Sequence, residues 1–356
     1  MWRSENVGPI TFFELVRGTG SASAALDALP ELARRGGLRR KIKITPKDQA
    51  RQELEALTAA GGRFIALGEP GYSTPLAAIA DPPPGLSVLG HADLLRKDTV
   101  AIVGARNASA SGGRFARGLA AELGQANFVI SSGLARGIDA QAHLGGIETG
   151  TVAVVAGGVD TVYPAENADL YARIVEAGAV VSEQPFGLKP QGRHFPRRNR
   201  IISGLALGVV IVEASLRSGT LITARLAGEQ GREVFAVPGS PLDPRHRGTN
   251  RLIRDGAALT EGADDVIEVL SALRRDQLDE PRRALGGEIP SISTTDQVSE
   301  TARQCILDAL GPTPVGVDEL VRQCHLTQAD VMVVMLELEL AGRLLRHGGG
   351  TVSLVL

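Results

Sequence analysis

The sequence predicts a Rossmann-like α/β domain with a doubly wound, mostly parallel sheet, between a small helical domain and a winged-helix domain. Three observations predict this fold. The chain has 356 residues, which suits two or three domains. Between residues 63 and 270, continuous runs of Val, Ile and Ala alternate with helical patterns, as in strands buried on both faces of a parallel sheet. Residues 296–356 combine three helical patterns with a glycine-tipped hairpin, which is typical of a winged helix.

Residues 1–62 are expected to form short helices. An apolar run follows Gly8-Pro9, and proline favours the first turn of a helix. Residues 24–38 are rich in helix formers, and no β-rich run is present. We therefore predict a helix-hairpin-helix or SAM-like domain. Residues 34–47 hold seven basic residues and no acidic one, so this stretch is either a solvated face or linker, or an auxiliary phosphate contact.

The central block, residues 63–270, is predicted to alternate strands with helices in a doubly wound order. The expected strands are 99–103, 128–131, 151–156, 179–182, 208–213, 233–237 and 257–259. The expected helices are 112–123, 138–148, 168–177, 198–207, 221–230 and 249–254.

Residues 271–295 are predicted to be a linker, because Gly, Pro and Ser cluster there and the apolar period is lost. The winged-helix domain, residues 296–356, follows. Its expected elements are helices 299–310, 317–324 and 329–340, and hairpin segments 344–346, 348–350 and 352–355.

Composition and missing motifs exclude several classes of protein. The net charge of −2 excludes a chain that grips nucleic acid by bulk charge alone. Two cysteines cannot form a disulfide framework or a four-cysteine zinc site. No Gly-Lys step, no G-x-G-x-x-G after a strand and no H-E-x-x-H is present, so we expect no P-loop ATPase, no NAD or FAD cofactor and no metal.

Hydropathy predicts a soluble, cytoplasmic protein without membrane segments. The longest uncharged apolar run, residues 201–212, has 12 residues, fewer than the ~20 that span a bilayer. The N-terminus lacks the apolar core of a signal peptide.

Gly, Ser and Arg residues gather where the predicted strands end, which is the edge at which open α/β sheets bind ligands. Glycines let backbone N–H groups approach an anion, and Arg side chains add bidentate phosphate contacts. The candidate site residues are Gly104, Arg106, Ser132, Gly133, Arg136, Arg197, Arg198, Asn199, Arg200, Ser218, Gly219 and Thr220.

For several residues in these segments, a purely structural role is the alternative to a role in binding. Gly133 and Gly137 could serve only tight turns, and Asp139 could be a first-turn acid or cap. His143 could be a core histidine, and Glu213 a strand-end carboxylate paired with an arginine.

The basic cluster after residue 184 favours nucleic acid. Residues 184–212 contain no acid, and Phe195 lies among their basic residues. Those residues are Lys189, Arg193, Arg197, Arg198 and Arg200. In a groove for single-stranded nucleic acid, cations follow the backbone and a ring stacks on a base.

These segments make the chain similar to the DNA-processing protein A family (DprA, also called Smf). The resembling stretches are VAIVGARNAS (100–109), SGLARGIDAQAH (132–143), TVAVVAGGVDTVYPAEN (151–167), SEQPFG (182–187), HFPRRNRIISGLA (194–206), VVIVEASLRSGTLITARLAGEQGREVFAVPG (209–239) and GTNRLIRDGA (248–257).

The resemblance implies a homodimeric, Rossmann-like protein that binds single-stranded DNA. It also implies a role in loading the RecA recombinase onto incoming strands during natural transformation, without turnover. By motif, residues 104–106 match the family's Gly-Ser-Arg phosphate-binding element, with Ala105 in place of serine. Residues 197–200 match its basic element after Phe-Pro, and residues 218–220 match its Ser-Gly-Ser/Thr turn.

Three functions are candidates for this chain. The leading hypothesis is a non-enzymatic recombination mediator. The alternative is a Rossmann-like nucleoside-phosphate hydrolase, suggested by Gly219-Thr220 and Glu229, although the Pro-Gly-Gly element of that group is absent. A transcription regulator is disfavoured, because the third helix of the winged-helix domain has three acids and no base and would repel phosphates. We therefore do not expect this domain to be the main DNA-binding element.

Overall fold

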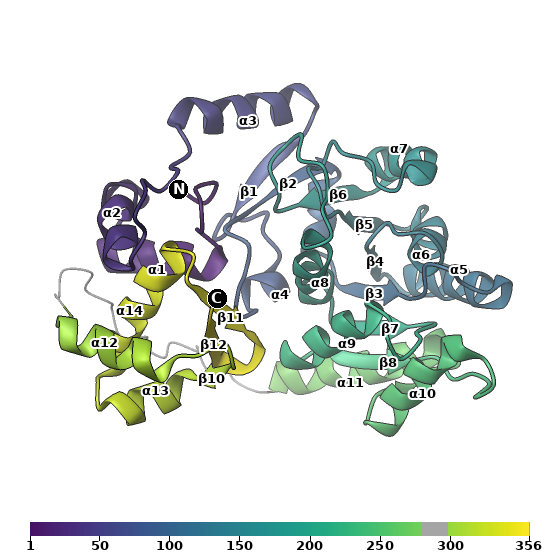
Figure 1. The fold of residues 1–356 in the computed structure, drawn as a ribbon. Helices are drawn as coiled ribbons and strands as arrows, with labels where there is room; N and C mark the ends of the chain where they lie inside the picture. The colour runs from purple at the N-terminus through teal and green to yellow at the C-terminus, as the bar shows by residue number, and fades with distance from the viewer. Residues whose placement is uncertain (280–297, 356) are drawn as a thin grey trace. The chain divides into compact units, whose positions relative to one another are not determined.

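The computed structural model describes residues 1–279 and 298–355 and forms two compact units (Figure 1). The terminal unit combines residues 1–50 with the described C-terminal residues. The sheet unit begins at Arg51 and contains the whole central block. Helix α3 (Lys47–Ala59) begins in the first unit and continues in the second.

The sheet unit is built around a nine-stranded sheet with the order β1-β2-β6-β5-β4-β3-β7-β8-β9. Its strands are β1 (Arg63–Ala66), β2 (Gly85–Gly90), β3 (Thr99–Val103), β4 (Val129–Ser132), β5 (Thr151–Val154), β6 (Ala179–Ser182), β7 (Gly208–Ile211), β8 (Glu233–Ala236) and β9 (Ala258–Leu259). The strands from β6 to β9 in this order pair in parallel. Strands β1 and β2 extend the sheet as antiparallel partners.

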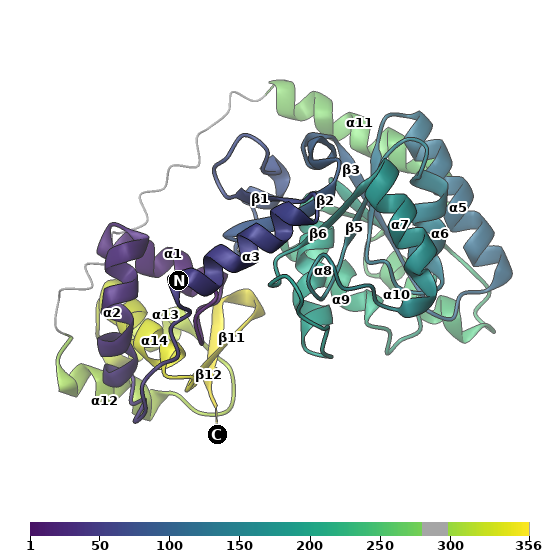
Figure 2. The same ribbon diagram turned by 90° about the horizontal axis from the view of Figure 1, so that it is seen from above.

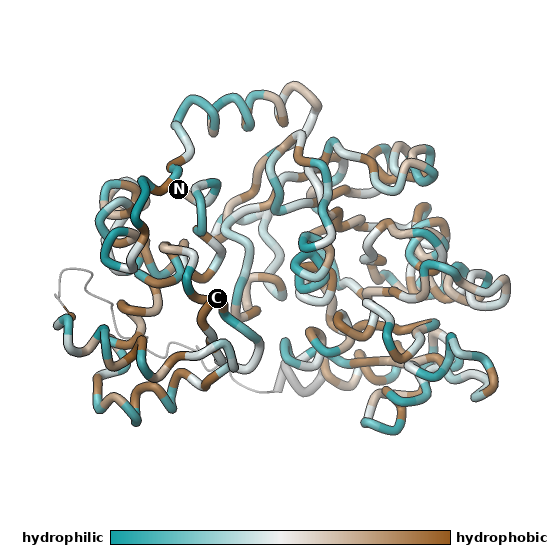
Figure 3. Tube along the Cα trace, viewed as in Figure 1, coloured by the Kyte–Doolittle hydropathy of each residue, from teal (hydrophilic) through white to brown (hydrophobic). Residues whose placement is uncertain are grey.

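Helices cover both faces of the sheet. They are α4 (Thr74–Ala77), α5 (Ala110–Gln125), α6 (Ile138–Gly146), α7 (Ala168–Ala177), α8 (His194–Leu205), α9 (Thr220–Glu229), α10 (Arg247–Arg254) and α11 (Ala263–Asp279). Strand β3 is buried on both faces: Ala101 and Val103 pack with residues of α8 and α9, and Val100 and Ile102 pack with residues of α5, α6 and α11. Figure 2 shows α8 and the α5–α6–α7 group on opposite sides of the sheet, and Figure 3 shows its central strands as mostly hydrophobic.

The strand order reverses between β3 and β7. From β3 the chain moves outward through β4, β5 and β6, and it then returns to place β7 on the other side of β3. The register pairs Val103 with Ile211, so both strands end at the same level. Such a reversal opens a crevice at the carboxyl ends of the strands, where open α/β sheets bind ligands.

The terminal unit contains the predicted winged helix. Its elements are α1 (Pro9–Thr19), α2 (Ala22–Arg35), α12 (Glu300–Ala309), β10 (Val315–Gly316), α13 (Val317–Cys324), α14 (Gln328–Leu340), β11 (Leu344–His347) and β12 (Thr351–Leu354). The three strands form a sheet in the order β10-β12-β11. Helix α14 is buried in two directions: Val334 and Leu338 belong to the winged-helix core, whereas Leu336 and Leu340 pack with Leu15 and Leu29 of the N-terminal helices.

Differences from the predicted elements have local causes. The prediction misses β1, β2 and the two-residue β10, which have weak or short apolar patterns. Helix α11 continues to Asp279, so the predicted linker is wrong for residues 271–279. Val266 and Leu270, one turn apart, anchor the first part of the helix in the core, and helix formers follow them in the sequence. The remaining linker residues, 280–295, lie outside the described residues. Within the described part of the chain, no helix combines the length and the apolar character that a membrane crossing requires.

Candidate functional site

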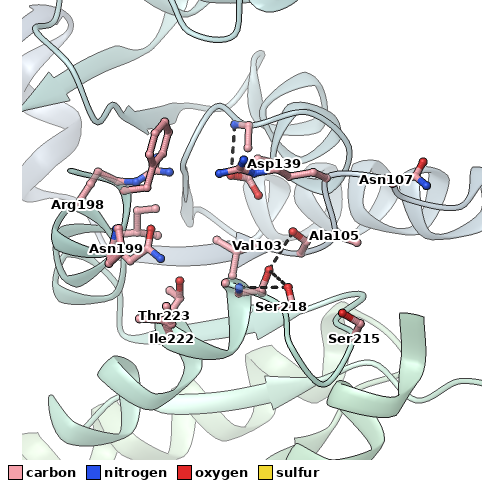
Figure 4. Close-up of a pocket in the computed structure, with 18 of the residues that line it drawn as sticks. Val103, Ala105, Asn107, Asp139, Arg198, Asn199, Ser215, Ser218, Ile222 and Thr223 are labelled. Carbon is pink, nitrogen blue, oxygen red and sulfur yellow. Dashed lines mark hydrogen bonds between the residues drawn. The ribbon is translucent and has the colours of Figure 1, made fainter. Parts of the chain in front are cut away.

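A pocket of about 580 Å³ lies at the reversal of the strand order. Three segments form most of its wall: the residues after β3, the first turns of α8, and the loop between β7 and α9. Figure 4 shows Arg198 and Asn199 of α8 across the pocket from Ala105 and Ser218. The fold therefore brings together residues from three of the predicted strand-end groups.

The loop after β3 places a cation beside two aromatic rings. A side chain at Gly104 would put its Cβ only 2.6 Å from Ile138 Cγ1, so glycine is required for this close turn. Arg106 is exposed, and its guanidinium carbon lies 5.3 Å from the centroid of the Phe195 ring. The Phe195 and Tyr163 centroids are 5.5 Å apart, with the rings tilted by 57°. An exposed cation and two rings thus stand in contact at the pocket.

The turn before α9 is fixed to the loop after β3. Thr220 Oγ1 accepts a bond from Ser218 Oγ at 3.0 Å and donates to the Gly104 carbonyl oxygen at 3.0 Å. The Thr220 backbone N–H donates to Ser218 Oγ at 3.2 Å. Gly219 is exposed with open space around it. The N-terminus of α9, with its partial positive charge, therefore lines the pocket.

Arg198 forms a buried part of the pocket wall. Its Nη1 donates to the carbonyl oxygens of Gly133, at 2.6 Å, and Val154, while its Nε has no hydrogen-bond partner among the residues that the structure describes. Burial lowers the pKa of Arg198 to about 10, which leaves the guanidinium charged at neutral pH. A Cβ at Gly133 would lie 2.3 Å from Arg198 Nη1, so this glycine makes room for the arginine. Arg198 both holds the loop after β4 and brings positive charge to the pocket.

The other arginines of α8 differ from Arg198 in their exposure and their partners, because successive residues of a helix point in different directions. Arg197 is exposed and has no ion pair among residues 1–279 and 298–355. Asn199 is half-buried and lines the pocket. Arg136, after β4, is exposed and lies 3.1 Å from Glu166.

Two predicted site residues have structural roles. Arg200 is buried and pairs with the carboxylates of Glu183 and Asp81, so its charge is already used inside the fold. Ser132 is fully buried and donates to the Ile102 carbonyl oxygen at 2.6 Å. Neither residue lines the pocket.

The acids and the histidine of these segments also have structural partners. Asp139 accepts the backbone N–H groups of Gly133 and Ala135. Glu213 is buried and accepts from the N–H and hydroxyl of Ser109, at the start of α5, rather than from an arginine. His143 contacts Thr151 Oγ1 at 2.7 Å, and burial lowers its pKa to about 3, so it is a neutral core histidine.

Several residues that line the pocket, or stand beside it, are absent from the predicted set. Tyr163 stands against Phe195, and Asn107, Ser215 and Arg245 line the pocket. The only sequence signal for Tyr163 is an aromatic residue in the loop that follows a buried strand. Within the described residues, no group of three or more His, Cys, Asp or Glu side chains could hold a metal ion.

Comparison with known proteins identifies the family. The family model described as DNA recombination-mediator protein A matches residues 63–271. The chain belongs to the DNA-processing protein A (DprA) family. The DprA-like N-terminal HHH domain matches residues 1–56, and the DprA winged helix domain matches residues 292–350. The family consists of DNA-processing recombination-mediator proteins, and this chain is one of them.

Relatives and solved structures agree with the DprA assignment. The putative DNA processing protein DprA of Mycobacterium tuberculosis is 35% identical over 344 residues, which cover 90% of this chain and 85% of that protein. Protein Smf of Escherichia coli is 38% identical over 286 residues, covering 80% and 75%. The structure of DprA from Streptococcus pneumoniae matches with a TM-score of 0.59 and 38% identity, over 63% of this chain and 78% of that one. DprA from Helicobacter pylori, whose structure concerns its single-stranded DNA binding mode, matches with a TM-score of 0.54 and 27% identity, over 61% and 98%.

Proposed function

We propose that this protein binds single-stranded DNA in the pocket at the reversal of the strand order. The observation that carries the proposal is the contact between exposed Arg106, Phe195 and Tyr163 beside a pocket that also contains Arg198. A cation attracts the phosphate backbone, and an aromatic ring stacks on an unpaired base. The single-stranded DNA binding mode studied for the Helicobacter pylori relative supports the same ligand class.

The pocket chemistry favours single strands and little sequence preference. Bases stack on rings only when they are not already stacked in a duplex, and every base has a face that can stack. Arginine contacts to phosphates carry no sequence information. The protein should therefore prefer oligo-dT to a duplex of equal length.

The biological role proposed here is that of a mediator. The bound DNA would be protected and RecA would be loaded onto it during natural transformation, by a homodimer that forms through the sheet unit. The family resemblance supports these three points. Binding without turnover is supported by Asp139, the acid among the residues that line the pocket: its carboxylate is held by the backbone N–H groups of Gly133 and Ala135, so it is not free to act as a base.

A fluorescence-anisotropy titration of labelled oligo-dT tests the pocket. Arg106→Ala should weaken binding by about 10- to 100-fold, because a charge-assisted hydrogen bond is worth ~1.5–3 kcal/mol. Phe195→Leu should weaken it to a similar degree, since stacking is worth ~1–3 kcal/mol per base. Arg225→Ala is the matched control: Arg225 is an exposed arginine of α9 that pairs with Glu229 and does not line this pocket.

The same titration at increasing salt tests the electrostatic part of the proposal. The logarithm of the binding constant should fall by ~0.7 per phosphate contact for each unit of log salt concentration. Affinity that is independent of salt, or that is normal in both Arg106→Ala and Phe195→Leu proteins with normal thermal stability, would refute the proposed site.

A further inference from the structure

The usual DNA-reading helix of the winged-helix domain is covered within the terminal unit. A winged helix reads DNA with its third helix, which here is α14. Leu336 and Leu340 of α14 pack with Leu15 and Leu29 of α1 and α2. The backbone of α14 also lies against Gly36: a Cβ at that glycine would be 1.9 Å from the Glu337 carbonyl oxygen. This face of α14 cannot reach a groove of DNA while the N-terminal helices cover it.

Two acidic residues of α14 also have arginine partners within the terminal unit. Glu337 accepts from Arg303 Nε at 2.9 Å, and Glu339 accepts from Arg346 Nε at 3.0 Å. These pairs occupy two of the four arginines of the described residues 298–355. Any contact of the terminal unit with DNA phosphates must therefore come mainly from elsewhere in the unit.

The positive charge of the terminal unit is concentrated in residues 1–50. These residues hold nine basic and five acidic side chains, although the whole chain has a net charge of −2. Four exposed cations follow α2, and they have no ion pair within the described residues. They are Arg39, Lys41, Lys43 and Lys47. We call these four side chains the basic row.

The backbone that carries the basic row is fixed in place. Buried and exposed side chains alternate along it. Ile42 and Ile44 pack into the core of the N-terminal helices, whereas Lys41, before Ile42, and Lys43, between the two isoleucines, are exposed. The Glu5 N–H donates to the Lys43 carbonyl oxygen at 3.0 Å, and the Lys43 N–H donates to the Glu5 carboxylate at 3.0 Å.

Two further contacts hold the same segment, and the second of them gives one of its basic side chains an ion pair. The Thr45 hydroxyl donates to the Arg3 carbonyl oxygen at 2.7 Å. Arg40 pairs with Glu5 and lowers the pKa of that carboxyl to about 2, so the charge of Arg40 is neutralised and Arg40 is outside the basic row. In extended backbone, side chains two residues apart lie about 6.6 Å from each other, so Lys41 and Lys43 on this segment can each contact a different phosphate, and Lys47 follows them at the start of α3.

We propose that the basic row is a second nucleic-acid contact, which binds the phosphate backbone of DNA independently of the pocket in the sheet unit. It goes beyond the function proposed above, because it assigns DNA binding to the N-terminal helical domain. Three of the five lysines in the chain lie in this row. A lysine acts on a phosphate as a point charge and demands no fixed geometry, which suits contact with a backbone of variable conformation.

The test uses the full chain, labelled dT of about 40 nucleotides and a salt titration. The variant Lys41→Ala/Lys43→Ala/Lys47→Ala should lower the log–log salt slope by about 2, at ~0.7 per lost contact. The charge-preserving control Lys41→Arg/Lys43→Arg/Lys47→Arg should keep the wild-type slope. Each single Lys→Ala variant should lower the slope by about 0.7. Fluorescence of Trp2, the only tryptophan of the chain, reports whether the terminal unit remains folded.

The result of the basic-row test can be distinguished from the result of the pocket test. Adding Arg106→Ala to the triple alanine variant should multiply the two losses of affinity, because the contacts lie in different units. If the pocket is wrongly placed, Arg106→Ala has no effect while the triple variant still lowers the slope. A triple alanine variant with the wild-type slope and affinity, or a triple arginine variant that loses as much as the alanine one, would overturn the basic row. A duplex of equal length, titrated in parallel, tells whether the row also contacts double-stranded DNA.

Discussion

Replacing Glu14 by glutamine should remove the loss of stability that this carboxyl causes in the terminal unit as the pH rises from 4.5 towards 7. Glu14 lies on α1, is 5% exposed, and accepts bonds from Arg346 Nη2 at 2.8 and 3.0 Å. Arg346 also donates to Glu339, so two carboxylates share one guanidinium. Arg17 is the remaining charged group that acts on Glu14. Burial dominates over these partners and raises the pKa of Glu14 to about 7.

The size and the sign of the effect follow from this pKa. The change from the ordinary value of 4.5 to about 7 is about 2.5 pH units, which corresponds to about 3 kcal/mol at 1.36 kcal/mol per unit. Between these values the folded protein keeps a proton that the unfolded chain has released. The stabilisation is therefore complete below pH 4.5 and is lost as the pH rises towards 7.

Urea denaturation followed by the fluorescence of Trp2 measures this effect, because the only tryptophan of the chain lies in the terminal unit. The unfolding free energy of the wild-type unit should fall by about 3 kcal/mol between pH 4.5 and pH 8, whereas that of Glu14→Gln should change little. Glu31→Gln is the control, since Arg34 and Arg35 hold the pKa of Glu31 at about 2, below this range. A wild-type stability that is constant or rises over this range would refute the reasoning.

Two glycines give further predictions. Gly36→Ala would bring a Cβ to 1.9 Å from the Glu337 carbonyl oxygen, and it should destabilise the terminal unit by at least ~1–3 kcal/mol in the same denaturation assay. The control is Gly316→Ala, a change in open space within the same unit, which should cost less than about 1 kcal/mol; equal effects of the two changes would contradict the packing argument. Gly133→Ala would force Arg198 out of its position and should lower oligo-dT affinity at unchanged salt; wild-type affinity in that variant would exclude Arg198 from the site.

Most of the fold follows from apolar patterning. Strand β3 (Thr99–Val103) and helices α7 (Ala168–Ala177) and α13 (Val317–Cys324) have the predicted bounds, because their apolar residues have a clear period and clear ends. Strands β1 and β2 are missed because they form the antiparallel edge of the sheet. Their short sequences therefore lack the continuous Val/Ile runs that mark buried parallel strands.

The sequence predicts where the site lies in the fold, but not which way each of its side chains points. Glycine and arginine after parallel strands locate the edge of the sheet, and Arg106 and Asn199 line the pocket there. Which way each arginine of α8 points is a tertiary property. Arg198 and Arg200 are both buried, yet one faces the pocket and the other pairs with Glu183. Local sequence cannot separate them, because their partners lie in segments far from α8 in the sequence.

The packing of α2 against α14 sets an order of events during synthesis. Gly36 and Arg343, which share a hydrogen bond in this interface, are 307 positions apart in the chain. At ~5–20 residues per second, the ribosome needs roughly 15–60 s to connect them. During that interval Leu15 and Leu29 lack the leucines of α14 that complete their core. A chain released before residue 340 would carry this unfinished apolar surface at its own beginning, where proteases and chaperones can recognise it.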